Sequence, residues 1–185
     1  DLIEYYHAAF GHYFITYLSG EISKLDDGTF AGWARTGRQF KAWTSTASGL
    51  SSVCRFFTTA FPPKSSHFYT PNAPECTVVK TSSVWGFEGE VFYTQNPDIA
   101  GNCPVNTVPV YRMYNQGQSG APNHRYTTDL NVRAQMLAQY GRNVAPLATI
   151  RGADNVLVGE TLDGKLVVAA PLDYHVALER PTGLL

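Results

Sequence analysis

Three short segments of the chain begin with a histidine and continue with an aromatic residue within two positions. "HFYT" begins at His67, "HRYT" begins at His124, and a looser copy, "HYFIT", begins at His12. Three neutral imidazoles that converge can bind zinc, but histidines on strands more often hydrogen-bond to a neighbouring backbone group or tyrosine. The sequence therefore predicts neither a metal site nor a bound cofactor.

Two arginines stand at one equivalent position of two matching segments. They are Arg55 and Arg112, and Glu4 takes this position in the first copy. A planar guanidinium suits bidentate contact with a carboxylate or with an oxygen-rich ligand. The alternative is a structural salt bridge to an acid of a neighbouring segment, such as Glu88 or Glu90. The sequence favours the salt bridge and leaves the ligand open.

Aromatic side chains are plentiful and suit the stacking of a sugar ring, whose hydroxyls are then satisfied at the rim of a site. The alternative is core filling, which we expect for Trp33 and Trp85. Residues beside two inserted loops, "AFPPKSS" and "QGQSGAPN", are expected to be exposed. The predicted ligand-binding residues are His67, His124, Phe57, Tyr114, Arg55, Arg112, Asn115 and Asn123.

The elements that position these residues form an internal repeat. Each histidine segment follows an aromatic doublet or near-doublet ("EYYH", "RFFT", "RMYN") and precedes a stretch with helical spacing. Asn72 and Asp129 are suited to cap the second and third helices. A W-x3-G-x2-F pattern then follows in the first two copies. The spacing predicts β-β-α-β repeats over about 1–50, 51–107 and 108–150.

These repeats indicate a mainly β fold with short helices (α+β). We expect a single domain over 1–185, in which the repeats are arranged with pseudo-threefold symmetry in a β-trefoil-like architecture, with a β-prism or short propeller as alternatives. Residues 151–185 read as a C-terminal hairpin extension around Asp163-Gly164. This hairpin is expected to replace or pair with the missing last strand of the third repeat.

The net charge, the hydropathy and the cysteines limit which partners, metal sites and compartment the sequence predicts. The formal net charge is −1, which indicates no nucleic-acid partner, and the apolar runs are too short to span a bilayer. The sequence has three cysteines, Cys54, Cys76 and Cys103. No two of them form a CxxC pair, so they match no zinc-binding pattern. Two of them could form a disulfide in an oxidising compartment, and the sequence does not say which two.

Several motifs occur in order over about residues 1–140: "AGWARTG", "CRFF", "HFYT", "FEGEVFY", "VYRMYN" and "HRYTT". With them the chain resembles a secreted three-repeat family of unknown function found in bacteria and fungi. Members of this family often occur beside hydrolase or adhesion domains. The resemblance implies an exported, lectin-like accessory module that binds a glycan.

Motifs of known enzyme classes do not occur: G-x-S-x-G, H-E-x-x-H and the P-loop are all missing from the sequence. We therefore expect an extracellular, non-catalytic recognition module for a carbohydrate or cell-surface polymer. One alternative is a secreted hydrolase with an unfamiliar site. Another is a structural or assembly protein that contacts other proteins through its aromatic surface. The oligomeric state stays open.

Overall fold

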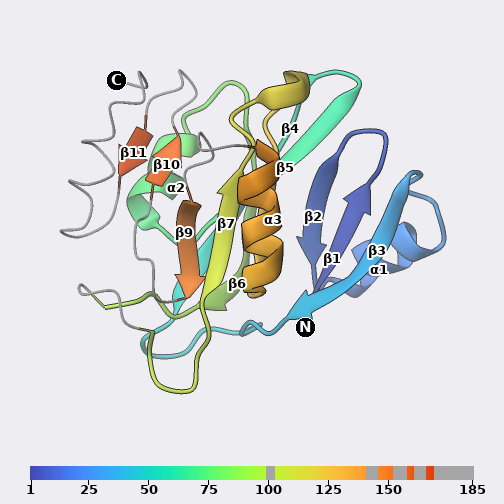
Figure 1. The fold of residues 1–185 in the computed structure, drawn as a ribbon. Helices are drawn as coiled ribbons and strands as arrows, with labels where there is room; N and C mark the ends of the chain where they lie inside the picture. Colours follow the sequence, from blue (N-terminus) through green and yellow to red (C-terminus); the bar gives the residue numbers. More distant parts are fainter. Residues whose placement is uncertain (99–102, 141–145, 152–157, 161–165, 169–185) are drawn as a thin grey trace.

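The computed structural model describes residues 1–98, 103–140, 146–151, 158–160 and 166–168. In these residues the chain is mainly β, with three short α-helices and small antiparallel sheets (Figure 1). This confirms the predicted mainly β class. The small sheets form no closed barrel among the described residues, so the comparison with a β-trefoil gains no support.

The first unit contains β1 (Leu2–His7), β2 (His12–Thr16), α1 (Ser19–Asp26) and β3 (Trp33–Phe40). Strand β1 lies between β2 and β3 and pairs antiparallel with both. The central strand therefore makes ladder hydrogen bonds along both edges, while α1 connects its two neighbours.

The second unit repeats this order. It contains β4 (Ser51–Phe61), β5 (Lys64–Thr70), α2 (Ala73–Val79) and β6 (Gly86–Thr94), with β4 in the centre of its sheet. A disulfide between Cys54 of β4 and Cys76 of α2 ties the helix to the central strand. The third cysteine, outside these elements, is not in a disulfide.

The third unit contains β7 (Val110–Tyr114), a short 3-10 turn η1 (Gln118–Gly120), β8 (His124–Thr127), α3 (Leu130–Tyr140) and β9 (Pro146–Arg151). Strand β7 is central, between β8 and β9. Helix α3 lies over β7 of this sheet (Figure 1). Its buried Val132 and Met136 side chains form a small core with β7.

The predicted hairpin does not replace the last strand of the third unit, and its predicted pairing with that strand stays a prediction, because most of the hairpin lies outside the described residues. Strand β9 takes that place, although it lacks the W-x3-G pattern of the other units. Strands β10 (Val158–Glu160) and β11 (Leu166–Val168) pair with each other in a separate two-stranded sheet. The turn at Asp163-Gly164 and most of the predicted 151–185 extension lie outside the described residues.

Two helices begin at the predicted capping residues. The Asn72 Oδ1 accepts a hydrogen bond from the Glu75 amide at 2.7 Å, and the Asp129 Oδ1 accepts from the amides of Asn131 and Val132 at 2.8 and 3.2 Å. These bonds satisfy amides that have no partner within the first turn of a helix.

Strand register corrects the alignment of the histidines. His67 lies opposite Phe57 and His124 lies opposite Tyr114, each on the central strand of its own sheet. In the first unit the equivalent pair is Tyr6 and Tyr13. Tyr13, not the preceding His12, therefore stands at the histidine position. The predicted alignment of His12 with His67 and His124 is therefore wrong by one residue, and a shift of one residue exchanges the two faces of a strand.

The second strands of the three units, β2, β5 and β8, pack against one another. Ile15, Tyr69 and Tyr126 stand at one register position of these strands. The Tyr69 hydroxyl donates to the Ile15 carbonyl oxygen at 2.6 Å, and the Tyr126 hydroxyl donates to the Tyr69 carbonyl oxygen at 2.9 Å. Each tyrosine thus binds the equivalent residue of the preceding unit.

Candidate functional site

A large cavity lies at the first junction, between the first and second units. Its volume is about 830 Å³. The first unit contributes Phe14, Leu25 and Trp33 to its wall, and the second unit contributes Phe57 and His67. We call it the first pocket. Its wall also carries Glu21, Lys24 and Glu88.

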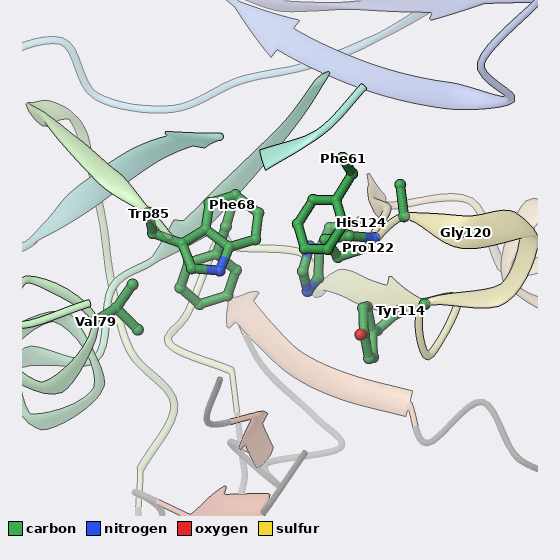
Figure 2. Close-up of a pocket in the computed structure, with 10 residues that line it drawn as sticks. Phe61, Phe68, Val79, Trp85, Tyr114, Gly120, Pro122 and His124 are labelled. Atoms are coloured by element: carbon green, nitrogen blue, oxygen red, sulfur yellow. The ribbon is translucent and has the colours of Figure 1, made fainter. Parts of the chain in front are cut away.

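A smaller cavity of about 310 Å³ lies at the second junction, between the second and third units (Figure 2). The second unit contributes Phe68, Val79 and Trp85, and the third unit contributes Tyr114 and His124. We call it the second pocket. By strand register and by distance along each unit, these residues correspond one to one to the five named first in the first pocket.

Each pocket histidine lies between two aromatic rings from different units. The His67 ring is 4.6 Å from that of Phe57 and 4.4 Å from that of Phe14 of the preceding unit. The His124 ring is 4.6 Å from that of Tyr114 and 5.0 Å from that of Phe68. The contact within each unit was expected from the repeat, whereas the contact across the junction was not.

Burial keeps both imidazoles neutral. It lowers the pKa of His67, against the opposing hydrogen bond and charge of Glu88. Burial, with the positive charge of Arg112 added, lowers the pKa of His124 well below the usual value. Burial alone would raise the pKa of the Glu88 carboxyl, but contacts with His67 and Arg55 outweigh it and lower that pKa. At neutral pH, therefore, Glu88 is ionised and both histidines are uncharged.

The two predicted arginines form ion pairs across the junctions. Arg55 of β4 binds both oxygens of Glu21 in the preceding helix, at 2.8 and 3.0 Å, and its Nε lies 2.7 Å from Glu88. Arg112 of β7 binds both oxygens of Glu75 in α2 at 3.1 Å. The salt-bridge alternative thus describes both residues. Arg112 is only 1% exposed and lines neither pocket.

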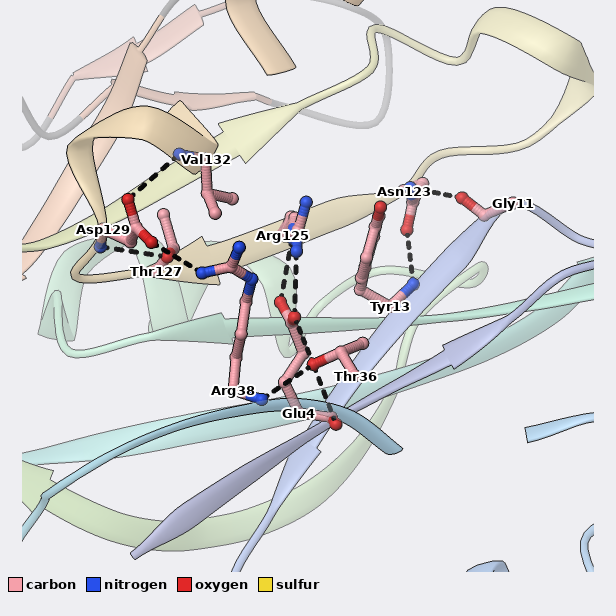
Figure 3. Close-up of polar contacts among 10 residues, drawn as sticks. All are labelled: Glu4, Gly11, Tyr13, Thr36, Arg38, Asn123, Arg125, Thr127, Asp129 and Val132. Carbon is pink, nitrogen blue, oxygen red and sulfur yellow. Dashed lines mark hydrogen bonds and ion pairs between the residues drawn. The ribbon is translucent and has the colours of Figure 1, made fainter. Parts of the chain in front are cut away.

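The closing junction, between the third and first units, reverses this charge pattern (Figure 3). Glu4 stands at the arginine position, and Arg125 of β8 binds both of its oxygens at 2.9 and 3.0 Å. Thr36 donates a further hydrogen bond to Glu4 at 2.7 Å. The Arg125 guanidinium also lies 4.1 Å from the centre of the Tyr13 ring. A cation and a tyrosine therefore replace the aromatic and histidine pair of the other junctions.

Asn115 and Asn123 are buried, although we expected them to be exposed beside the inserted loop. The Asn115 amide donates to the carbonyls of Gln118 and Ala121 at 2.9 and 3.0 Å. Asn123 accepts from the Tyr13 amide and donates to a carbonyl in the β1–β2 turn (Figure 3). Both side chains hold the β7–β8 loop, because short amide side chains pair readily with backbone groups in turns.

Tyr114 and His124 are also mostly buried, at 9% and 6% exposed, yet they line the second pocket. Trp33 and Trp85, which we expect to fill the core, are half-buried: each packs against a core cluster and also lines one of the two pockets. The equal W-x3-G spacing in the first two units could have indicated a shared role for these tryptophans. The ligand-binding role of the eight predicted residues stays a prediction.

In the part of the chain that the structure describes, no group of three or more His, Cys, Asp or Glu side chains could hold a metal ion, and no helix is long and apolar enough to cross a membrane.

Comparison with known protein families gave one result. A family model described as "Domain of unknown function (DUF5648)" matches residues 1–144. Neither the curated proteins nor the solved structures contain a match. The matched residues include both pockets and all three junction ion pairs.

Proposed function

Since the chain belongs to a family of domains of unknown function (DUF5648), its function has to be argued from its site, and we propose that it is a non-catalytic recognition module. Its ligand is a carbohydrate or another cell-surface polymer. The observation that carries this proposal is the pair of equivalent aromatic pockets, each built where one unit meets the next.

The walls of the pockets suit a sugar ring. Sugars present apolar C–H faces that pack on aromatic rings, and hydroxyls that bind a few polar groups at the edge. Trp33 and Phe57 offer such faces in the first pocket, with Glu88 and His67 as polar neighbours. Both cavity volumes reach the range of about 300–1,000 Å³ that is typical of small-molecule sites.

Recognition fits the first pocket better than glycoside hydrolysis does. A hydrolase needs one carboxylic acid with a raised pKa as its proton donor. The pKa of Glu88 is lowered instead, and Arg55 binds Glu88 and Glu21 together. An ionised carboxylate in this position is suited to accept hydrogen bonds from ligand hydroxyls.

We also propose that the three units are related by a pseudo-threefold axis through the register position of Ile15, Tyr69 and Tyr126. The tyrosine hydroxyl bonds to the preceding unit support this arrangement, as do the repeated Arg–Glu pairs at the first two junctions. A polymer with regularly spaced sugars could then contact both pockets at once, which raises its overall affinity without new contacts.

Export from the cell is part of the same proposal. The Cys54–Cys76 disulfide supports it, because disulfides persist mainly in oxidising compartments.

A glycan array probed with the folded chain tests the proposed function. Heat-inactivated chain and the His12→Ala variant are the controls. His12 lines neither pocket. We expect specific binding by the folded chain and by His12→Ala, and weaker binding by His67→Ala and His124→Ala. No binding, together with turnover of ester or glycoside substrates, would favour the hydrolase. No binding, together with concentration-dependent self-association, would favour an assembly protein.

A further inference from the structure

The second pocket differs from the first in charge. The described residues that line it include no Asp, Glu, Lys or Arg, whereas the first pocket carries Glu21, Lys24 and Glu88. Two replacements explain part of this difference. Val78 takes the helical position of Lys24, and Glu75, which takes the position of Glu21, is buried in its pair with Arg112.

His124 is the main polar group of the second pocket for which the described part of the chain supplies no hydrogen-bond partner at Nδ1. The residue is only 6% exposed. Its ring lines the cavity and lies between the rings of Phe68 and Tyr114 (Figure 2). Its Nδ1 is fully covered and has no hydrogen-bond partner among the described residues. His67 differs, since its Nε2 lies 3.4 Å from Glu88.

The covered Nδ1 indicates which way the ring can bond. Native structures leave a buried N–H group without a partner less often than an acceptor. The neutral tautomer with an unprotonated Nδ1 therefore fits best, and it places the proton on Nε2. An Nε2–H group can donate to an oxygen atom of a ligand in the cavity.

We infer that the second pocket binds an uncharged group that combines an oxygen acceptor with an apolar surface, as the acetamido group of an N-acetylated sugar does. The carbonyl oxygen accepts a hydrogen bond from His124, and the methyl group packs on Phe68 and Trp85. An ammonium or a carboxylate is disfavoured, because it would lose its hydration and meet no opposite charge in the wall. This inference rests on the proposed function.

Three monosaccharides with the same ring and different charges test the inference: N-acetylglucosamine, glucosamine and glucuronic acid. Each is titrated into the full chain at neutral pH while the indole N–H signals of Trp85 and Trp33 are followed by NMR. We expect N-acetylglucosamine alone to shift the Trp85 signal. His124→Ala should weaken this binding at least about fivefold, the loss of one neutral hydrogen bond. His124→Gln, which keeps an N–H donor, should restore part of it.

Other outcomes separate this inference from the proposed function. Equal shifts of the Trp85 signal with the charged sugars, or unchanged binding by His124→Ala, would overturn the inference, while glycan binding itself would still stand. If no sugar shifts either indole and the glycan array is also silent, both the inference and the proposed function are wrong.

Discussion

At the scale of single residues, the two pocket histidines have the same surroundings and different partners. Each packs between a ring of its own unit and a ring of the preceding unit, but within the part of the chain that the structure describes only His67 also contacts a carboxylate. A strand-borne histidine can be recognised in the sequence. The ring that covers it from a neighbouring unit cannot, because it depends on how the units pack.

The buried histidines predict that stability falls in mild acid. Burial lowers the pKa of His12, His67 and His124 below the unfolded value of about 6.5. Below that pH the unfolded chain binds protons that the folded chain does not. Stability is therefore lost between pH 7 and pH 5, by at most about 1.4 kcal/mol per pH unit for each histidine. Urea unfolding should show a smaller loss for His124→Phe, and an equal loss would contradict the assignment.

The buried ion pair between Arg112 and Glu75 predicts a large effect of breaking it. Arg112→Met should lower the free energy of unfolding by about 3–5 kcal/mol, because it leaves the Glu75 carboxylate buried without its partner. Arg38→Met is the matched control, since the Arg38 side chain is 43% exposed. Urea unfolding that finds equal losses for the two variants would contradict this account.

At the scale of elements, the sequence spacing was enough to predict a mainly β fold with short helices, and the described elements follow the order strand, strand, helix, strand three times. The caps at Asn72 and Asp129 could be predicted because they depend on local bonds alone. The register of β2 could not, because "HYFIT" allows two alignments one residue apart and strand pairing decides between them. Strand β9 was missed because ladder bonds use the backbone and require no W-x3-G motif.

The helix cap gives a local prediction. Asn72→Ala should lower the free energy of unfolding by about 1 kcal/mol, since the Glu75 amide loses its acceptor. Thr77→Ala is the control in the same helix, because Thr77 is exposed and alanine favours helices. Urea unfolding of both variants checks this, and a larger loss for Thr77→Ala would be the contrary result.

The disulfide gives a second prediction at this scale. Replacing Cys54 and Cys76 by serine should lower the free energy of unfolding by about 3 kcal/mol. The reason is that the cross-link restricts a loop of 22 residues in the unfolded chain. Alkylation of the denatured, non-reduced protein should label one cysteine, Cys103, by mass spectrometry. Labelling of all three would count against the disulfide and against export.

At the scale of the whole molecule, each of the three junctions combines an ion pair with an aromatic contact, and the closing junction differs from the other two in the residues that supply them. The first two junctions combine an arginine, a helical glutamate and a histidine between aromatic rings. The closing junction combines Glu4 with Arg125 and covers Tyr13 with the guanidinium. The sequence showed that Glu4 breaks the pattern, but only the packing of the units shows that Arg125 compensates for it.

The most direct test of the proposed binding function is the affinity of the chain for a glycan polymer that is positive on the array. Isothermal titration calorimetry is carried out on the wild-type chain, His67→Ala, His124→Ala, the double variant and His12→Ala, with thermal melting in parallel. We predict that each single pocket variant binds at least about fivefold more weakly, that the double variant binds weakest of all, and that His12→Ala keeps its affinity. If the pocket variants and His12→Ala lower the melting temperature alike and leave the affinity unchanged, the histidines only hold the fold together, and the pockets are not the binding site.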